Sequence, residues 1–317
     1  MPCDHQHEDL PGHVGHGHHQ HFSLERFDRA MAIGVGLNTV FVIIEILAGF
    51  WGGSLALLAD AGHNAGDVVG LLLAWGASRL ARRPPTRRYT WGLRRSTIYA
   101  ALINALLLVA ACGGILWEAF HRLREPVPVA GPWVVMVAAA GVVINTLTAL
   151  LLVRGCSTDA NVRGAFLHMA ADAAVSAGVV VAGIVIALTG MAWIDPLVGI
   201  AITLAILVST WGLLRESVDL ALDAVPRGID PDTVTASLMA IPGVREVHDL
   251  HVWNTSTSEI ALTVHVVVPD EGGYQRVLAT ASEDLRARFG VAHTTIQIEC
   301  EETCARCPQR SAEALRA

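Results

Sequence analysis

The sequence contains no lysine, so arginine supplies every fixed positive charge on its side chains. The phosphate-binding loop of nucleotide-driven pumps needs a lysine, so we expect no nucleotide partner for this chain. Charged residues make up only 16% of the 317 residues, whereas soluble domains have about 25%. The formal net charge of −7 also argues against a nucleic-acid partner, because such partners select basic surfaces.

Other common signals are missing as well. The first residues, "MPCDHQHEDLPGHVGHGHHQH", lack the apolar core of a secretory signal peptide, so we expect none. The six cysteines do not have the spacing of a disulfide framework, since three of them crowd near the C-terminal end. We find neither an HExxH zinc-protease motif nor a nucleophile elbow, and we therefore do not expect an enzyme.

Apolar residues are abundant, at 53% of the chain, and they collect in long runs. A membrane helix needs roughly 20 such residues, and each run is near that length. The pattern predicts an all-α bundle of six membrane helices within residues 25–215. The runs cover about residues 28–50, 56–80, 96–119, 131–153, 164–189 and 193–214.

The arginines predict how this bundle is oriented. The segment between the second and third runs is rich in them, whereas the segments after the first and fifth runs have none. Positive charge marks the cytoplasmic side, so both termini are expected there. Usage rich in Ala and Val, with Arg in place of Lys, indicates a bacterial source and an inner membrane. The arginines of the basic segment are Arg79, Arg82, Arg83, Arg87, Arg88, Arg94 and Arg95.

From about residue 216 the pattern is that of a soluble domain. Helical periodicity covers 231–241 and 272–290, and Val- and Thr-rich strands are expected at 244–255, 259–269 and 292–299. The order α-β-β-α-β predicts a small α+β domain over 216–300, with its helices on one face of a sheet. A His-rich tail (1–24) and a short C-terminal tail (301–317) flank these domains.

The segment "SLALLADAGHNAGDVVGLLLAW" combines a membrane pattern with ionisable residues, which are costly in a bilayer. His63 and Asp67 are four residues apart and share a helix face; His168 and Asp172 repeat this spacing in the fifth run. If the two helices face each other, two imidazoles and two carboxylates form the tetrahedral set that suits zinc. A structural hydrogen-bonded pair and a metal-free proton relay are the alternatives.

Other polar residues in the runs have simpler interpretations. Asp60 could be a gate residue or a helix cap, and Asp195, next to Pro196, is interpreted as the N-cap of the last run. The remaining three are expected to form hydrogen bonds between helices: Asn38, Glu45 and Asn145.

Taken together, several stretches resemble the cation diffusion facilitators, a family of exporters of zinc and related divalent cations. They are "GSLALLADAGHNAGDV", "RRYTWGLRRSTIYAALINALLL", "NVRGAFLHMAADAAVSAGVVVAGIVI", "IDPLVGIAI", "VHDLHVW" and "HTTIQIE". The resemblance implies six membrane helices, a metallochaperone-like (ferredoxin-like) αββαβ cytoplasmic domain, a homodimer, and exchange of Zn²⁺ for H⁺.

The resemblance also implies site residues. It assigns the membrane transport site to His63, Asp67, His168 and Asp172, and His63 resembles the zinc-selective members more than the cadmium-transporting ones. Zinc would then be both cargo and regulator; export of Cd²⁺, Co²⁺ or Ni²⁺ is an alternative. The implied cytoplasmic ligands are His248, His265, Glu299, Cys304 and Cys307.

Some interpretations stay open. His251 and His293 could bind metal or only form hydrogen bonds. The N-terminal histidines could collect or deliver zinc weakly. A membrane sensor that binds metal without moving it is the second functional hypothesis, although it does not need His–Asp pairs inside the membrane. The N-terminal histidines in question are His13, His16, His18, His19 and His21.

Overall fold

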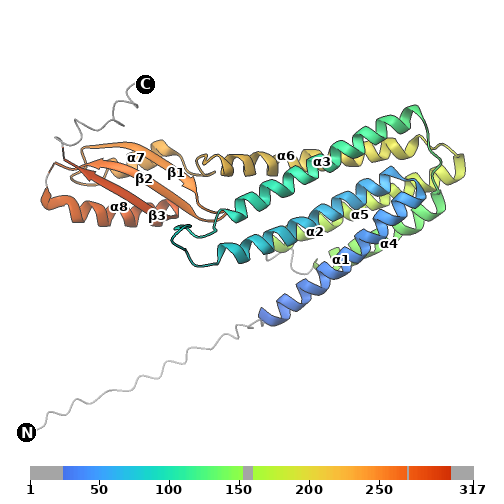
Figure 1. The fold of residues 1–317 in the computed structure, drawn as a ribbon, viewed down its shortest axis with the longest axis horizontal. Coiled ribbons are helices and arrows are strands. Elements are labelled where there is room, and N and C mark those ends of the chain that lie inside the picture. The colour runs from blue at the N-terminus through green and yellow to red at the C-terminus, as the bar shows by residue number, and fades with distance from the viewer. Residues whose placement is uncertain (1–23, 153–159, 270, 301–317) are drawn as a thin grey trace, which may run out of the picture.

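The computed structural model describes residues 24–152, 160–269 and 271–300. Six long helices come first (Figure 1): α1 (Leu24–Gly52), α2 (Leu55–Ala81), α3 (Ser96–Arg124), α4 (Gly131–Leu152), α5 (Ala160–Thr189) and α6 (Ile194–Ala221). A small domain follows: α7 (Pro231–Met239), β1 (Glu246–Asn254), β2 (Ile260–Val267), η2 (Glu271–Gly273), α8 (Tyr274–Phe289) and β3 (Val291–Glu299). The predicted fold class, a helical membrane domain followed by an α+β domain, is confirmed.

The helices differ in how clearly their composition marks them as membrane spans. In the described part of the chain, four are long and apolar enough to cross a bilayer. α2 is not among them, because four polar residues of its first half lower its mean hydropathy. In α1, the apolar stretch Asn38–Gly52 is shorter than these four spans. The four spans are Ser96–Arg124, Gly131–Leu150, Phe166–Thr189 and Ile194–Ala221.

α2 lies at the centre of the bundle, where it contacts α1, α3, α5 and α6. α3 packs along α6, and α4 packs along α5 (Figure 1). Small residues line the close approaches: a Cβ atom at Gly66 of α2 would lie 2.2 Å from the Leu108 side chain of α3. This close packing leaves α2 little freedom, so its polar residues are held at fixed positions.

Asp195 fixes the beginning of α2. Its carboxylate accepts hydrogen bonds from the Ser54 hydroxyl at 2.5 Å and from the backbone N–H of Leu55 at 2.6 Å. Ser54 in turn caps α2 by accepting from the N–H of Leu57 at 3.1 Å. The prediction that Asp195 caps its own helix is wrong. It lies in the first turn of α6, and its side chain satisfies the free N–H groups of the neighbouring helix instead.

We expect Asp195→Ala to destabilise the membrane domain. The Ser54 hydroxyl and the Leu55 N–H, both buried, would lose their acceptor, and each unsatisfied group costs about 1–3 kcal/mol. Thermal unfolding of the purified protein in detergent should show a clearly lower midpoint. Asp195→Asn keeps one acceptor oxygen and should lower the midpoint less. Equal midpoints for Asp195→Ala and the wild type would contradict this account of how α2 begins.

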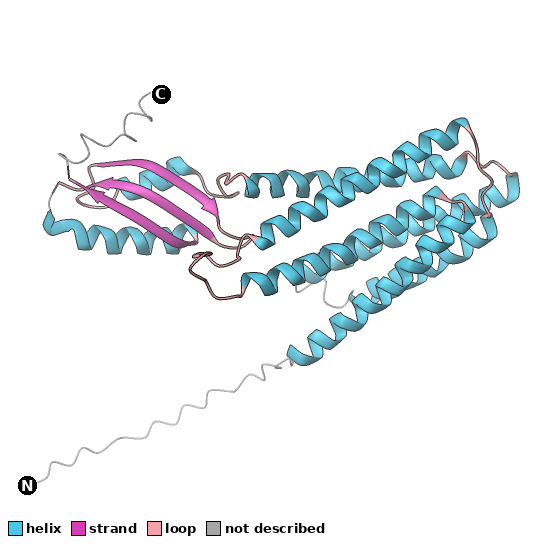
Figure 2. Ribbon diagram, in the orientation of Figure 1, coloured by secondary structure: helices cyan, strands magenta, loops and turns pink. Residues whose placement is uncertain are grey.

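In the small domain the strand order is β1-β2-β3, with β1 antiparallel and β3 parallel to β2 (Figure 2). The alternating Leu262, Val264 and Val266 of β2 are buried together with Leu238 of α7 and Leu285 of α8. Both helices therefore cover the same face of the sheet. The other face is left for the polar side chains that alternate with these apolar ones.

Charged pairs connect the two domains at the arginine-rich end of the bundle. Arg94 forms an ion pair with Glu259, and Arg95 pairs with Asp223 at 2.5 Å. The Asp223 carboxylate raises the pKa of the Arg95 guanidinium above its ordinary value. The backbone N–H of Thr257 also donates to the Thr97 hydroxyl at 3.2 Å. The α+β domain therefore lies on the same side of the bundle as the basic segment (Figure 1).

Candidate metal centres

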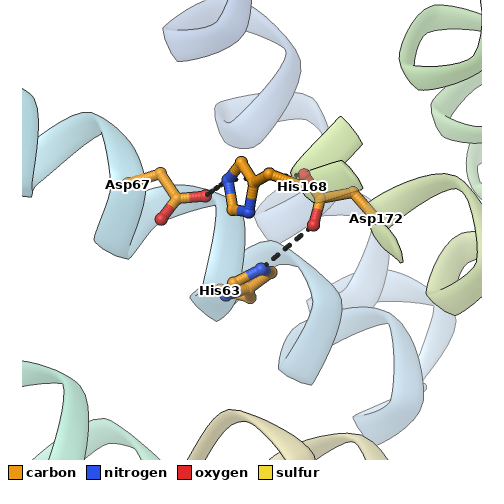
Figure 3. Close-up of side chains that lie close together, drawn as sticks. All are labelled: His63, Asp67, His168 and Asp172. Atoms are coloured by element: carbon orange, nitrogen blue, oxygen red, sulfur yellow. Dashed lines mark hydrogen bonds and ion pairs between the residues drawn. The ribbon is translucent and has the colours of Figure 1, made fainter. Parts of the chain in front are cut away.

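Two helices bring four ionisable side chains together inside the bundle. His63 and Asp67 project from α2, and His168 and Asp172 project from α5 toward them (Figure 3). Each residue offers one ligand atom, and all four atoms lie within 4.8 Å of one another. The sequence spacing explains this convergence, because residues four apart lie on one face of each helix.

The four side chains are paired across the helices. His63 Nε2 lies 3.1 Å from Asp172 Oδ1, and His168 Nε2 lies 3.0 Å from Asp67 Oδ2 (Figure 3). Asp172 Oδ2 also lies 3.7 Å from His168 Nε2. The Nε2 atom of each imidazole therefore faces a carboxylate oxygen on the other helix. The same lone pairs can hold either shared protons or one metal ion.

The group matches zinc in chemistry and in size. Zinc takes four nitrogen, oxygen or sulfur ligands at about 2.0–2.3 Å. Such bonds place neighbouring ligand atoms about 3.4 Å apart, close to the 3.0, 3.1 and 3.7 Å of the His–Asp contacts here. The Asp172 side chain is 3% exposed, whereas that of His168 is 43% exposed. One side of the group is therefore closed and the other is accessible.

Hydrogen bonds around this group decide several predictions. Asp60 is not a helix cap, because it lies inside α2 and accepts from the Ser176 hydroxyl of α5 at 2.7 Å. Glu45 of α1 accepts from Asn64 Nδ2 at 3.0 Å, which confirms the predicted bond between helices. Asn145 is buried, but its Nδ2 has no hydrogen-bond partner in the described part of the chain.

A second group lies on the sheet of the α+β domain. His248 of β1 is opposite His265 of β2, and Glu299 closes the group from the end of β3. His265 Nδ1 is 3.0 Å from Glu299 Oε1, and His248 Nε2 is 3.5 Å from Glu299 Oε2. The three ligand atoms lie within 4.8 Å of one another. Among the described residues, these are the two groups of three or more ligands compact enough to hold a metal ion.

Three buried atoms of this second group lack hydrogen bonds. Both ring nitrogens of His248, and Oε2 of Glu299, have no hydrogen-bond partner among the described residues. The two side chains are 3% and 2% exposed, so water does not satisfy these atoms freely. Unsatisfied buried polar atoms are costly, and a cation bound between His248 Nε2 and Glu299 Oε2 would satisfy two of these three atoms. The residues present therefore fit a metal ion.

Sequence reasoning missed Asp249 as a neighbour of this group. The pairing of β1 with β2 is irregular between His248 and His251, and Asp249 has a φ of 51° there. Such bulges redirect side chains, and Asp is among the residues that tolerate this conformation. The Asp249 carboxylate lies 3.1 Å from His251 Nε2 and 3.7 Å from His265 Nε2. "VHDLHVW" contains no local signal for this bulge.

The remaining candidates are placed differently. His251 is exposed and lies beside Asp249, and His293 contacts the Trp91 ring with centroids 4.5 Å apart. Neither belongs to a compact ligand group in the part of the chain that the structure describes. Cys304, Cys307 and the N-terminal histidines lie outside the described residues.

Fold and site together define a class: a membrane protein with four side chains between two of its helices that could hold a metal ion. Comparison with family models agrees. Residues 31–220 match the model described as "Cation efflux transmembrane domain". Residues 226–301 match "Cation efflux protein, cytoplasmic domain".

Individual relatives match over most of their length. The metal cation efflux system protein CzcD of Cupriavidus metallidurans is 37% identical over 87% of this chain and 88% of its own. The zinc transporter ZitB of Escherichia coli is 38% identical over 86% and 87%. The cadmium, cobalt and zinc/H(+)-K(+) antiporter of Bacillus subtilis is 32% identical over 91% and 93%. The chain therefore belongs to the cation efflux family, and the resemblance to the cation diffusion facilitators is confirmed.

One solved structure is also similar to this chain. The metal-bound C-terminal domain of the CzcD transporter is 37% identical to this chain, with a TM-score of 0.21. The match covers 22% of this chain and 99% of that one.

Proposed function

We propose that this protein exports divalent cations, with zinc as the main cargo, from the cytoplasm in exchange for protons. The observation that carries the proposal is the ligand group His63, Asp67, His168 and Asp172, which lies between two membrane helices and is accessible on one side. Ionisable residues inside a membrane bundle mark ion pathways.

The ligand chemistry supports zinc as the cargo. Imidazole suits zinc better than manganese or magnesium, which prefer oxygen ligands. Two of the four ligands are imidazoles, from His63 and His168. Two of the three relatives support the same class, because their names include zinc. Cadmium and cobalt, which one relative's name also includes, are secondary cargoes in this proposal.

Protons are the proposed counter-ion because they compete with metal for the same atoms. Metal binding needs neutral imidazoles and ionised carboxylates, so a bound ion displaces protons. On the outer side, protons would reoccupy His63 and His168 and release the metal. A tenfold proton gradient contributes about 1.4 kcal/mol per proton. The crossed His–Asp pairs place an imidazole nitrogen beside each carboxylate of the site.

The α+β domain would act as the zinc-responsive part of a homodimer. His248, His265 and Glu299 would hold the regulatory ion there, and Cys304 and Cys307 are proposed additional ligands. Metal bound at this group would favour one of two arrangements of the homodimer that are in equilibrium. The arginine-rich segment supports a cytoplasmic location for this domain and for both termini. A bacterial inner membrane is the proposed location.

Transport in proteoliposomes tests the exchange. We expect zinc to enter vesicles containing the wild-type protein while protons leave, as reported by a zinc dye and a pH dye in the lumen. His63→Ala should abolish both signals, because one of the four ligands is lost. Intact zinc transport by His63→Ala would contradict the proposed site.

The same experiment separates transport from sensing. A sensor would bind zinc at His248, His265 and Glu299 without moving it across the membrane. Zinc binding by the wild-type protein without accumulation in the lumen would therefore favour the sensor over the exporter.

A further inference from the structure

A second polar group lies beside the transport site, and none of its members is a proposed metal ligand. It consists of Glu45 from α1, Asp60 and Asn64 from α2, and Ser176 from α5. Glu45, Asp60 and Ser176 are each 0% exposed. Asn64 is 5% exposed. We refer to these four residues as the acidic pocket.

Each carboxyl group of the pocket has one oxygen with a donor and one without. Asn64 Nδ2 donates to Glu45 Oε2 at 3.0 Å, and the Ser176 hydroxyl donates to Asp60 Oδ2 at 2.7 Å. Glu45 Oε1 and Asp60 Oδ1 are buried and have no hydrogen-bond partner among the described residues. Two fully buried acids therefore each present a free oxygen, and among the described residues no basic side chain is hydrogen-bonded to either.

α4 also borders the acidic pocket, and it has a glycine there. Gly141 of α4 has no side chain, and a Cβ atom there would lie 3.2 Å from Ser176 Oγ and 3.6 Å from Glu45 Oε1. The described part of α4 contains no Asp, Glu, Lys, Arg or His. The acidic pocket is therefore formed where α1, α2, α4 and α5 meet.

The ionisable groups beside the pocket are those of the transport site. α2 contributes His63 and Asp67, and α5 contributes His168 and Asp172. An unpaired ionised carboxylate without water is very costly, and such groups take up a proton instead. Protons satisfy the two free oxygens without the wide oxygen shell that a larger cation needs.

We propose that Glu45 and Asp60 form a proton-binding site separate from the metal ligands. This site carries some of the protons that are exchanged for each metal ion. Asp60 lies one helical turn from His63, toward the end of α2 that is away from the arginine-rich segment. The pocket therefore lies between the transport site and the proposed outer side, where protons enter. This inference rests on the proposed exchange of metal for protons.

Counting protons per zinc in proteoliposomes tests the inference. Glu45→Gln and Asp60→Asn replace the proton-binding groups by neutral amides of the same shape. We expect each variant to bind zinc with a dissociation constant within about twofold of the wild type, measured by calorimetry. Each should nevertheless release fewer protons per zinc transported. Glu118→Gln, which changes the half-exposed acid paired with Arg122 on α3, is the matched control and should leave the ratio unchanged.

An infrared measurement on the wild-type protein keeps the test independent of how the variants fold. A protonated carboxylic acid has its own carbonyl band, and we expect this band at neutral pH in the wild type. Absence of the band, or an unchanged proton-to-zinc ratio in folded Glu45→Gln and Asp60→Asn, would overturn the inference alone. Absence of any zinc-driven proton movement in the wild type would instead overturn the proposed exchange itself. The inference would also be overturned, in favour of a monovalent cation in the pocket, if transport depended on Na⁺ or K⁺ and Glu45→Gln removed that dependence.

Discussion

Asp172→Asn is expected to abolish zinc transport and to weaken zinc binding in the membrane domain by more than about 100-fold, since losing even the partner of a ligand costs 10–100-fold. Asp172 is the most buried of the four proposed ligands, and its two oxygens lie 3.1 Å from His63 and 3.7 Å from His168. The amide keeps the shape of the side chain but loses the charge that balances the cation. Calorimetric zinc titration and vesicle uptake, carried out on the same preparation, measure both effects.

Asp219→Asn is the matched control for this change. Asp219 is a partly exposed acid on α6 and belongs to neither ligand group. Its replacement should leave zinc binding and transport at wild-type levels. The account of the transport site fails if Asp172→Asn folds normally and transports zinc as fast as Asp219→Asn does.

Glu299→Gln is expected to remove the stabilisation of the α+β domain by zinc. At a zinc concentration 100 times the dissociation constant, binding stabilises a folded site by about 2.7 kcal/mol. Glu299 faces both imidazoles of its group, His265 at 3.0 Å and His248 at 3.5 Å. The variant should therefore unfold at the same temperature with and without zinc. Hydrogen exchange along β1 and β3 of the full-length protein, followed with and without zinc, measures this locally.

Without metal, Glu299→Gln should not destabilise the α+β domain greatly, because Glu299 Oε2 already lacks a hydrogen-bond partner among the described residues. Glu283→Gln, at an exposed acid of α8, should keep the full zinc response. Zinc that still protects β1 and β3 in Glu299→Gln would show that the regulatory ion binds elsewhere, with Cys304 and Cys307 as the next candidates.

Local patterns predicted much of this architecture. The apolar runs predicted the six long helices, and the period of two in "IALTVHVV" predicted that Leu262, Val264 and Val266 share one buried face of β2. Ala261 and Val267 of the other face are buried as well, which this alternation did not predict. The convergence of the four side chains of the proposed transport site was also predictable, because a His and an Asp four residues apart share a helix face. Only the assumption that α2 and α5 meet was needed to combine the two pairs.

Features that depend on contacts distant in sequence were not predictable in this way. Asp195 binds the N-terminus of α2, and its bond to Ser54 joins residues separated by 141 positions. The bulge at Asp249 follows from how β1 pairs with β2. Glu45 was expected to bond another helix, but its position near Asp60 follows from the packing of four helices. Asp60 could not be assigned from its sequence position, because an Asp near a helix end is compatible with capping.

The location of bound zinc tests the central claim most directly. Crystals of the zinc-loaded protein, measured at the zinc absorption edge, should show an anomalous peak between α2 and α5. The account predicts that this ion lies about 2.0–2.2 Å from the imidazole nitrogens and carboxylate oxygens of the transport site. Its ligands would be His63, Asp67, His168 and Asp172. A protein that transports zinc but shows zinc only on the α+β domain, with none between α2 and α5, would contradict the account.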